Sequence, residues 1–89
     1  MSPPPWRLHY ANSARKDLRR LDPPVRTRIV TALERLASQG AQDSGLVRLR
    51  GRPELRLRVG DWRVLVELDA PSHMIRVKRV LPRGRAYER

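Results

Sequence analysis

The chain has no cysteine and no phenylalanine, and tryptophan and tyrosine contribute only two residues each. Without cysteine it can form no disulfide bond, thiolate metal site or cysteine nucleophile. No apolar run approaches the ~18 residues of a transmembrane helix. Residues 1–5 lack the basic and apolar regions of a secretory signal peptide, so we expect a cytoplasmic protein with no membrane contact. Gly51 and Gly60 stand alone, and there is no glycine-rich phosphate loop.

Acidic residues are also scarce. The chain has 9 Asp and Glu against 20 Lys and Arg, which gives a formal net charge of +11. Such a charge on a small chain predicts a polyanionic partner, most simply a nucleic acid. Only Lys16 and Lys78 are lysines, so 18 of the 20 basic residues are arginines, which favour bidentate contacts with phosphate. A genome-wide bias toward arginine codons would explain part of this number but not where the arginines fall.

The residues that are present suffice for one small domain. With 89 residues, 39% of them hydrophobic, the chain can build a single core and is too short for two. We expect a loose proline-rich tail over residues 1–5 and one domain over residues 6–89. Within that domain, residues 6–10 alternate apolar and polar side chains with the period of two that is typical of a strand.

The next segment predicts two helices. Asn12 and Ser13 are residue types that cap helix N-termini, and an apolar stripe with helical spacing follows over residues 14–21. A second helix is expected to follow Asp22 as its N-cap and to end at Gly40. Because only two or three residues join these helices, we expect them to form an antiparallel hairpin.

The second half of the chain returns to a period of two. Residues 55–59 and 62–68 alternate as two strands joined by a tight turn at residues 60–61. A third strand over residues 75–82 has a slip in its alternation near Arg79, which predicts a β-bulge or the end of pairing. The predicted order is β-α-α-β-β-β, an α+β fold. In it a small antiparallel sheet carries the helical hairpin on one face and leaves the other face open.

Arginines are expected on that open face. Arg56 and Arg58 share one face of their strand, about 7 Å apart, and Arg63 lies just past the tight turn. Fixed cations on one surface would hold a phosphodiester and stabilise the charge of its pentacoordinate state. The alternative is a solvated face whose arginines keep the sheet soluble.

Three other residues could carry chemistry. Tyr87 is a lone aromatic in a basic tail, and it either covers an apolar seam or serves as a general base or stacking platform. In the second case nearby arginines would lower its pKa by favouring the phenolate. His9 and His73 have no companion at metal-ligand spacing. We therefore expect no metal and no cofactor, and solvated positions for both histidines.

The chain resembles toxins of the RelE/ParE superfamily from bacterial type II toxin–antitoxin systems. The most specific match is the run L-R-V-G-D-W-R-V-L over residues 57–65, within a longer match over residues 55–66. Residues 48–51, 75–80 and 83–87 also match, and the resemblance extends over residues 6–89.

The superfamily contains two activities. RelE-like members cleave mRNA in the ribosomal A site without a metal; the RNA 2′-OH is the nucleophile, and a 2′,3′-cyclic phosphate remains. ParE-like members inhibit DNA gyrase and lack the nuclease residues. The resemblance implies a RelE-like endoribonuclease that arrests translation, because all five positions of the nuclease pattern hold basic or aromatic residues. These implied catalytic residues are Arg56, Arg58, Arg63, Arg83 and Tyr87. The implied RNA-binding residues are Arg48, Arg50, Arg76, Lys78 and Arg85.

One departure from the pattern restricts the chemistry. Arg56 and Arg58 stand where the superfamily often has lysine, and a guanidinium cannot act as a base at neutral pH. The base must then be Tyr87 as phenolate, or a group of the RNA or ribosome, and the acid would be Arg83 or water. Two alternatives stay open: a gyrase inhibitor on the same fold, and a basic nucleic-acid-binding module with no toxic role.

The resemblance also implies partners besides mRNA and the ribosome. A cognate antitoxin should be encoded alongside the toxin, and it usually supplies a disordered segment that folds across the toxin. Here we expect that segment to be acidic, to match the charge of +11.

Overall fold

The computed structural model describes residues 6–39, 46–48 and 54–84. Its elements in chain order are β1 (Arg7–Tyr10), α1 (Asn12–Arg19), α2 (Pro23–Gln39), β2 (Leu46–Arg48), β3 (Leu55–Val59), β4 (Trp62–Asp69) and β5 (Met74–Pro82). This confirms the predicted α+β fold and adds the short strand β2 ahead of β3. The predicted helix end at Gly40 lies outside the described residues.

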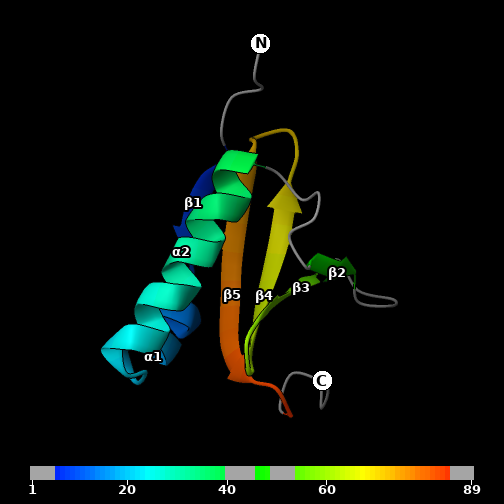
Figure 1. Ribbon diagram of the computed structural model, residues 1–89. Coiled ribbons are helices and arrows are strands. Elements are labelled where there is room, and N and C mark those ends of the chain that lie inside the picture. The colour runs from blue at the N-terminus through cyan, green and yellow to red at the C-terminus, as the bar shows by residue number, and fades with distance from the viewer. Residues whose placement is uncertain (1–5, 40–45, 49–53, 85–89) are drawn as a thin grey trace.

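The strands form one sheet in the order β1-β5-β4-β3-β2 (Figure 1). The sheet is mixed, because β1 runs parallel to β5 while the other neighbours are antiparallel. The chain leaves β1 through the two helices, and β2, β3, β4 and β5 then follow as antiparallel neighbours. The last of these strands, β5, lies beside β1 and runs in the same direction. Within the described residues, no helix is long and apolar enough to cross a membrane.

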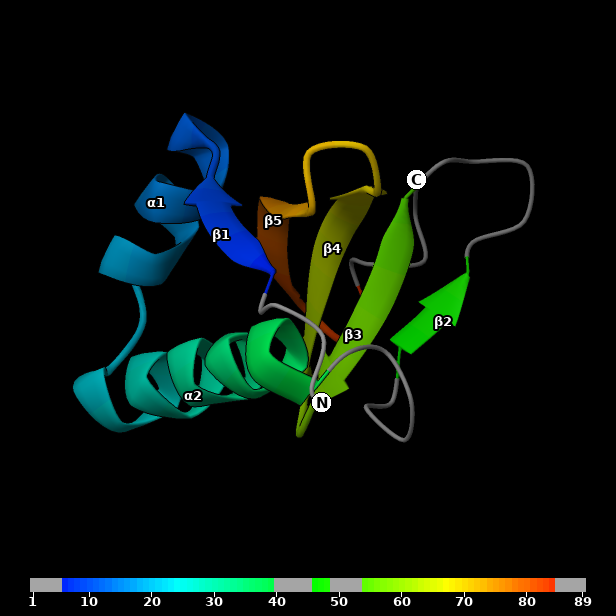
Figure 2. The ribbon, with the colours of Figure 1, turned by 90° about the horizontal axis from the view of Figure 1, so that it is seen from above.

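Helix α2 lies on one face of the sheet, while α1 lies at its edge, beside β1 and β5 (Figure 2). Their apolar stripes pack on the alternating apolar residues of the strands, which buries the core that the periodicity predicted. The largest fully buried side chains are Ile29, Leu33, Val64, Val66, Ile75 and Val77. Burying one such side chain stabilises a fold by about 1.5–3 kcal/mol, so these residues hold the helices on the sheet.

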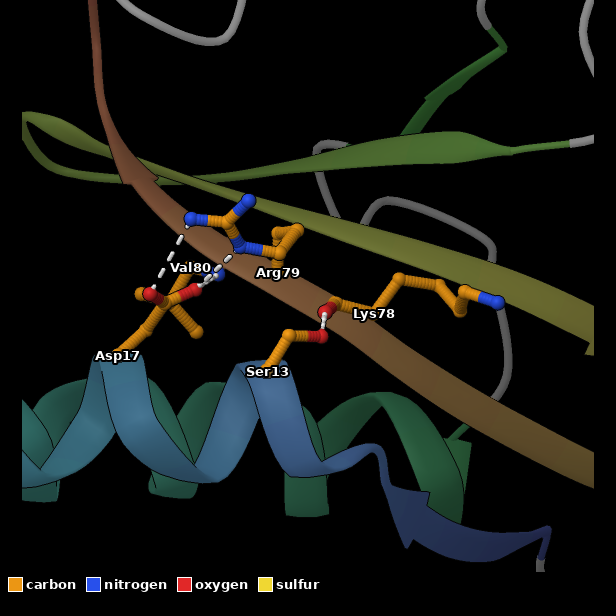
Figure 3. Close-up of polar contacts among 5 residues, drawn as sticks. All are labelled: Ser13, Asp17, Lys78, Arg79 and Val80. Carbon is orange, nitrogen blue, oxygen red and sulfur yellow. Dashed lines mark hydrogen bonds and ion pairs between the residues drawn. The ribbon is translucent and has the colours of Figure 1, made fainter.

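Helix α1 protects the edge of β5 that β1 leaves uncovered. β1 pairs only with residues 74–77 of β5. Beyond that point the Ser13 hydroxyl donates to the Lys78 carbonyl at 2.7 Å, and the Asp17 carboxylate accepts from the Val80 N–H at 2.9 Å (Figure 3). Unpaired backbone groups on an edge strand would otherwise need water or another chain.

The N-terminus of α1 differs from the prediction. The N-cap residue is Ala11, which makes no side-chain cap hydrogen bond. The expectation that Asn12 or Ser13 caps the helix is therefore wrong, because the helix already begins at Asn12 and the Ser13 hydroxyl bonds to β5 instead. The tertiary hydrogen bond to Lys78 thus uses the Ser13 hydroxyl, which local chemistry alone would place at the helix cap.

The predicted slip in β5 is a β-bulge. Leu65 pairs with Arg79 while the next residue, Val66, pairs with Val77, so Lys78 is the extra residue.

His73, in the turn before this strand, has a left-handed backbone with φ of 53°, and its ring centroid lies 4.2 Å from that of Trp6. Its Nε2 is buried, so the expected solvated position is wrong for this histidine.

Candidate functional site

Three of the predicted arginines lie on the sheet face that the helices leave open. Arg58 is the direct partner of Arg63 across β3 and β4, and Arg56 is the partner of Leu65. Partners that face each other lie on the same side of a sheet, with Cβ atoms about 4.5–5.5 Å apart. The intervening residues face the helices; they are Leu57, Val59, Val64 and Val66, all buried. The alternation of the sequence thus places the three arginines together.

Arg63 is buried and holds the β3–β4 turn. The residue as a whole is only 4% exposed to solvent. Its Nη1 donates to the carbonyls of Gly60 and Trp62, each at 2.8 Å, while its buried Nε has no hydrogen-bond partner. Among the described carboxylates none forms an ion pair with this guanidinium. A buried charge without a counterion is costly, so an anion that approaches this face would be stabilised.

Two further arginines belong to the same end of the sheet. Arg58 is exposed beside Arg63. Arg83 is exposed just after β5, and its backbone N–H donates to the Asp61 carbonyl at 2.9 Å, which ties the end of β5 to the β3–β4 turn. Like charges placed directly opposite each other destabilise a sheet. An anion bound at this end would reduce the repulsion between Arg58 and Arg63. We call Arg56, Arg58, Arg63 and Arg83 the turn-end arginines.

The other half of the open face is electrically compensated. Arg76 pairs with Asp69, and Lys78 pairs with Glu67, each at 3.3 Å. Hydrogen bonds from Ser72, and then the Arg76 charge, hold the pKa of the Asp69 carboxyl below its usual value. These two predicted RNA-binding residues therefore lie on the expected face but already have carboxylate partners.

The remaining candidates are placed only in part. Arg48 is the last residue of β2, where its backbone pairs with Leu55. Arg50, Arg85 and Tyr87 lie outside the described residues.

Sequence reasoning missed the contact that fixes α1 to β5. Asp17 accepts from Arg79 Nε at 2.8 Å and from Arg79 Nη2 at 3.3 Å (Figure 3). Hydrogen bonding to this carboxylate raises the pKa of Arg79, so one arginine that could have bound a ligand is fixed inside the fold. The slip in alternation near Arg79 was the available signal, but the partner lies 62 residues away.

Comparison with known proteins gives a consistent picture. The family model of the ParE toxin of the type II toxin–antitoxin system parDE matches residues 8–87. No match to a curated protein was found.

Solved structures share the fold. A chain of the toxin–antitoxin complex RelBE2 from Mycobacterium tuberculosis is similar, with a TM-score of 0.79 and 23% identity over 90% of this chain and 93% of that chain. A chain of the archaeal RelE–RelB complex from Pyrococcus horikoshii has a TM-score of 0.77 and 22% identity, covering 90% and 97%. A mutant of the E. coli toxin RelE in the free state has a TM-score of 0.72 and 22% identity, covering 94% and 88%.

Proposed function

We propose a function from the premise that the chain belongs to the ParE toxin family and is a toxin of a type II toxin–antitoxin system. The proposed function is that of a ribosome-dependent endoribonuclease that cleaves mRNA and arrests translation. The observation that carries the proposal is the pair of arginines across β3 and β4. Arg63 is buried and has no counterion among the described residues, and Arg58 is exposed directly opposite it. This pair suits a phosphodiester, whose negative charge would compensate both guanidinium groups.

The proposed reaction is an in-line transesterification. The RNA 2′-oxygen forms a bond to phosphorus and loses its proton, while the bond between phosphorus and the 5′-oxygen breaks and that oxygen gains a proton. The products are a 2′,3′-cyclic phosphate and a free 5′-hydroxyl. Arg58, with Arg56 beside it, would stabilise the charge that grows on the phosphoryl oxygens. Arg63 would add a fixed positive charge from beneath.

The base must be a group other than these arginines, since a guanidinium cannot accept a proton at neutral pH. We propose Tyr87 as the base, acting as phenolate, or else a group supplied by the RNA or the ribosome. Arg83 or water would protonate the leaving 5′-oxygen. Arg48, Arg50 and Arg85 would contact the RNA backbone, with weaker contributions from Arg76 and Lys78 because they are already paired. An mRNA and ribosome target also places the reaction in the cytoplasm.

The test is cleavage of an mRNA by the purified protein with and without ribosomes. Arg58→Gln, Arg83→Ala and Tyr87→Phe should each slow cleavage by about 10²-fold or more, a typical loss for a stabilising or proton-transfer group. Arg76→Gln is the matched control, because it removes an arginine from the same face that is already paired with Asp69. Equal losses in Arg58→Gln and Arg76→Gln would contradict the assignment, and intact cleavage by Tyr87→Phe would exclude it as the base.

A second candidate is inhibition of DNA gyrase, which the match to the ParE toxin model favours. In that case Arg56, Arg58 and Tyr87 would be dispensable for toxicity. A supercoiling assay with the same variants separates the two functions. Loss of supercoiling without any mRNA cleavage would replace the nuclease proposal.

Under either activity we propose a cognate acidic antitoxin as partner. The similar chains from Mycobacterium tuberculosis and Pyrococcus horikoshii both come from complexes with an antitoxin. The excess positive charge of this chain, +11, supports an acid-rich partner segment.

A further inference from the structure

A hollow of about 190 Å³ lies between the end of α1 and the end of β5. It is at the same end of the sheet as the turn-end arginines, because β4 begins and β5 ends there. Its apolar wall includes Leu21, Trp62 and Pro82, and its polar wall includes Asp17, Arg20 and Arg79. An apolar cavity of about 150 Å³ holds one benzene molecule. The hollow is therefore large enough for one planar ring system.

Trp62 gives the hollow a flat aromatic wall. It is the first residue of β4, pairs with Pro82 of β5, and packs against the hydrophobic core while remaining partly exposed. Trp6 has His73 as a ring partner, whereas no aromatic ring in the part of the chain that the structure describes is stacked on Trp62. An indole that rests on a core and reaches a hollow is a platform on which another planar ring can stack.

The polar wall adds positive charge and a hydrogen-bond acceptor. Arg20 is exposed, and none of the described carboxylates forms an ion pair with it. Arg79 is fixed by Asp17, and Val80 donates its N–H to the same carboxylate (Figure 3). A residue of an antiparallel pair exchanges both backbone hydrogen bonds with its partner or neither. The Val80 carbonyl therefore also points away from β4, toward the edge where the hollow lies.

We propose that this hollow binds one unstacked nucleobase of the RNA strand whose phosphates lie on the turn-end arginines, an inference that rests on the endoribonuclease function proposed above. The base would stack on Trp62, and Arg20 would contact a phosphate beside it. The Val80 carbonyl would accept a hydrogen bond from an exocyclic amine, which adenine, cytosine and guanine have and uracil lacks. An aromatic side chain of a protein would also fill the hollow, but it brings no phosphate for Arg20.

The position of the hollow lets one strand reach both sites. Trp62 and Arg63 are neighbours in β4, and successive side chains of a strand point to opposite faces. Arg83 directly follows Pro82, and its backbone is tied to the β3–β4 turn through Asp61. A flexible single strand that passes this end of the sheet can therefore place a phosphate against Arg83 and turn the next base into the hollow. Bases displayed in this way are recognised by stacking and by their hydrogen-bonding edges.

The probe is a single-stranded RNA of about eight nucleotides, within the range that one small binding surface covers, with 2′-O-methyl groups that prevent transesterification. A chain of the same length without bases carries the same phosphate charge. Trp62→Leu should weaken binding of the RNA by about fivefold or more, the cost of losing a stacked base, and should leave binding of the abasic chain unchanged. Trp62→Phe keeps a ring and should bind the RNA like the parent chain. Fluorescence anisotropy of labelled RNA measures binding, and circular dichroism establishes that both variants fold.

Tryptophan fluorescence reports the stacking directly. The chain has only two tryptophans, so quenching by the RNA that disappears in Trp62→Phe would place the base at Trp62. Arg20→Gln should lower the slope of log K against log salt concentration by about 0.7, the value for one phosphate of a single strand. Arg19→Gln is the matched control, because this exposed neighbour lines the groove between α1 and α2 instead, and it should leave the slope unchanged.

Three results would overturn the assignment of this hollow. They are equal weakening of RNA and abasic binding by Trp62→Leu, quenching that persists in Trp62→Phe, and equal changes of slope in Arg20→Gln and Arg19→Gln. Adenosine monophosphate is a further probe. If it binds as tightly as the RNA and with the same dependence on Trp62, the hollow is a site for free nucleotides and the RNA assignment is wrong.

The mRNA cleavage assay separates this inference from the proposed function. If the parent chain does not cleave mRNA but Trp62→Leu still loses the RNA and not the abasic chain, the nuclease proposal fails and the base site stands. If the parent chain cleaves mRNA and Trp62→Leu binds the RNA normally, only the base site fails.

Discussion

Replacement of Asp17 should test how α1 is held on the sheet. Its carboxylate accepts three hydrogen bonds, two from Arg79 and one from the Val80 N–H. The Asp17 side chain is 12% exposed and the Arg79 side chain 33% exposed. In Asp17→Ala the Val80 N–H loses its acceptor and Arg79 loses its counterion.

The magnitude follows from these contacts. A hydrogen bond to a charged group contributes about 1.5–3 kcal/mol, and an unsatisfied buried N–H costs about 1–3 kcal/mol. The contributions share one carboxylate and so do not add, and solvent around Arg79 weakens the ion pair. We therefore expect Asp17→Ala to lower the free energy of unfolding by about 3 kcal/mol. This is a large share of the roughly 4–13 kcal/mol expected for 89 residues. Asp17→Asn keeps a neutral acceptor and should lose about half as much.

Urea denaturation followed by circular dichroism measures this loss. Glu34→Ala is a suitable control because it also removes one carboxylate, from an exposed position on α2, and it should stay within about 0.5 kcal/mol of the parent chain. If Asp17→Ala unfolds at the same urea concentration as Glu34→Ala, α1 is held by apolar packing alone. The edge-capping role of Asp17 would then be refuted.

Arg63→Met should lower the free energy of unfolding by about 1–3 kcal/mol, because two carbonyls of the β3–β4 turn lose their donor. Arg58→Met should change it by less than about 0.5 kcal/mol, and similar losses in urea denaturation of the two would contradict the distinction. Gly60→Ala should cost about 1–2 kcal/mol, because φ is 58° there while the nearest atom to an added Cβ, at 3.6 Å, is an ordinary contact; an unchanged melting temperature would contradict this strain. Burial, and then the Glu34 charge, raise the pKa of Tyr10, so its contribution to stability is complete below about pH 10 and declines as pH rises through the raised pKa. Tyr10→Phe should remove that alkaline decline in denaturation measured as a function of pH, and an unchanged decline would assign it to other groups.

The period of the side chains was enough to predict the two faces of the sheet. Alternation around the turn at residues 60–61 required Arg58 and Arg63 to share a face once the two strands paired without a gap, and the structure has this register. The same alternation predicted the irregularity in β5, which is the bulge at Lys78. These features are local, since each depends on residues that are neighbours in sequence or across a tight turn.

Contacts between distant segments could not be predicted in this way. Nothing in the residues around Ser13 indicates that its hydroxyl bonds to a carbonyl 65 residues away instead of capping its own helix. The burial of Arg63 was also not foreseen, because alternation gives the face of a side chain and not its depth. The groove between α1 and α2 depends on how far the helices diverge, which the length of their connection does not determine.

The partners of the arginines indicate where the net charge of +11 can act. Arg79 is held by Asp17, Arg76 by Asp69 and Lys78 by Glu67. Charges that are paired in this way contribute little to the attraction of a ligand, because their field is largely compensated nearby. Arg63 and its neighbour Arg58 have no such carboxylate among the described residues. Asp17, Glu67 and Asp69 thus compensate charge on β5 and leave the pair at the β3–β4 turn without a carboxylate partner among the described residues.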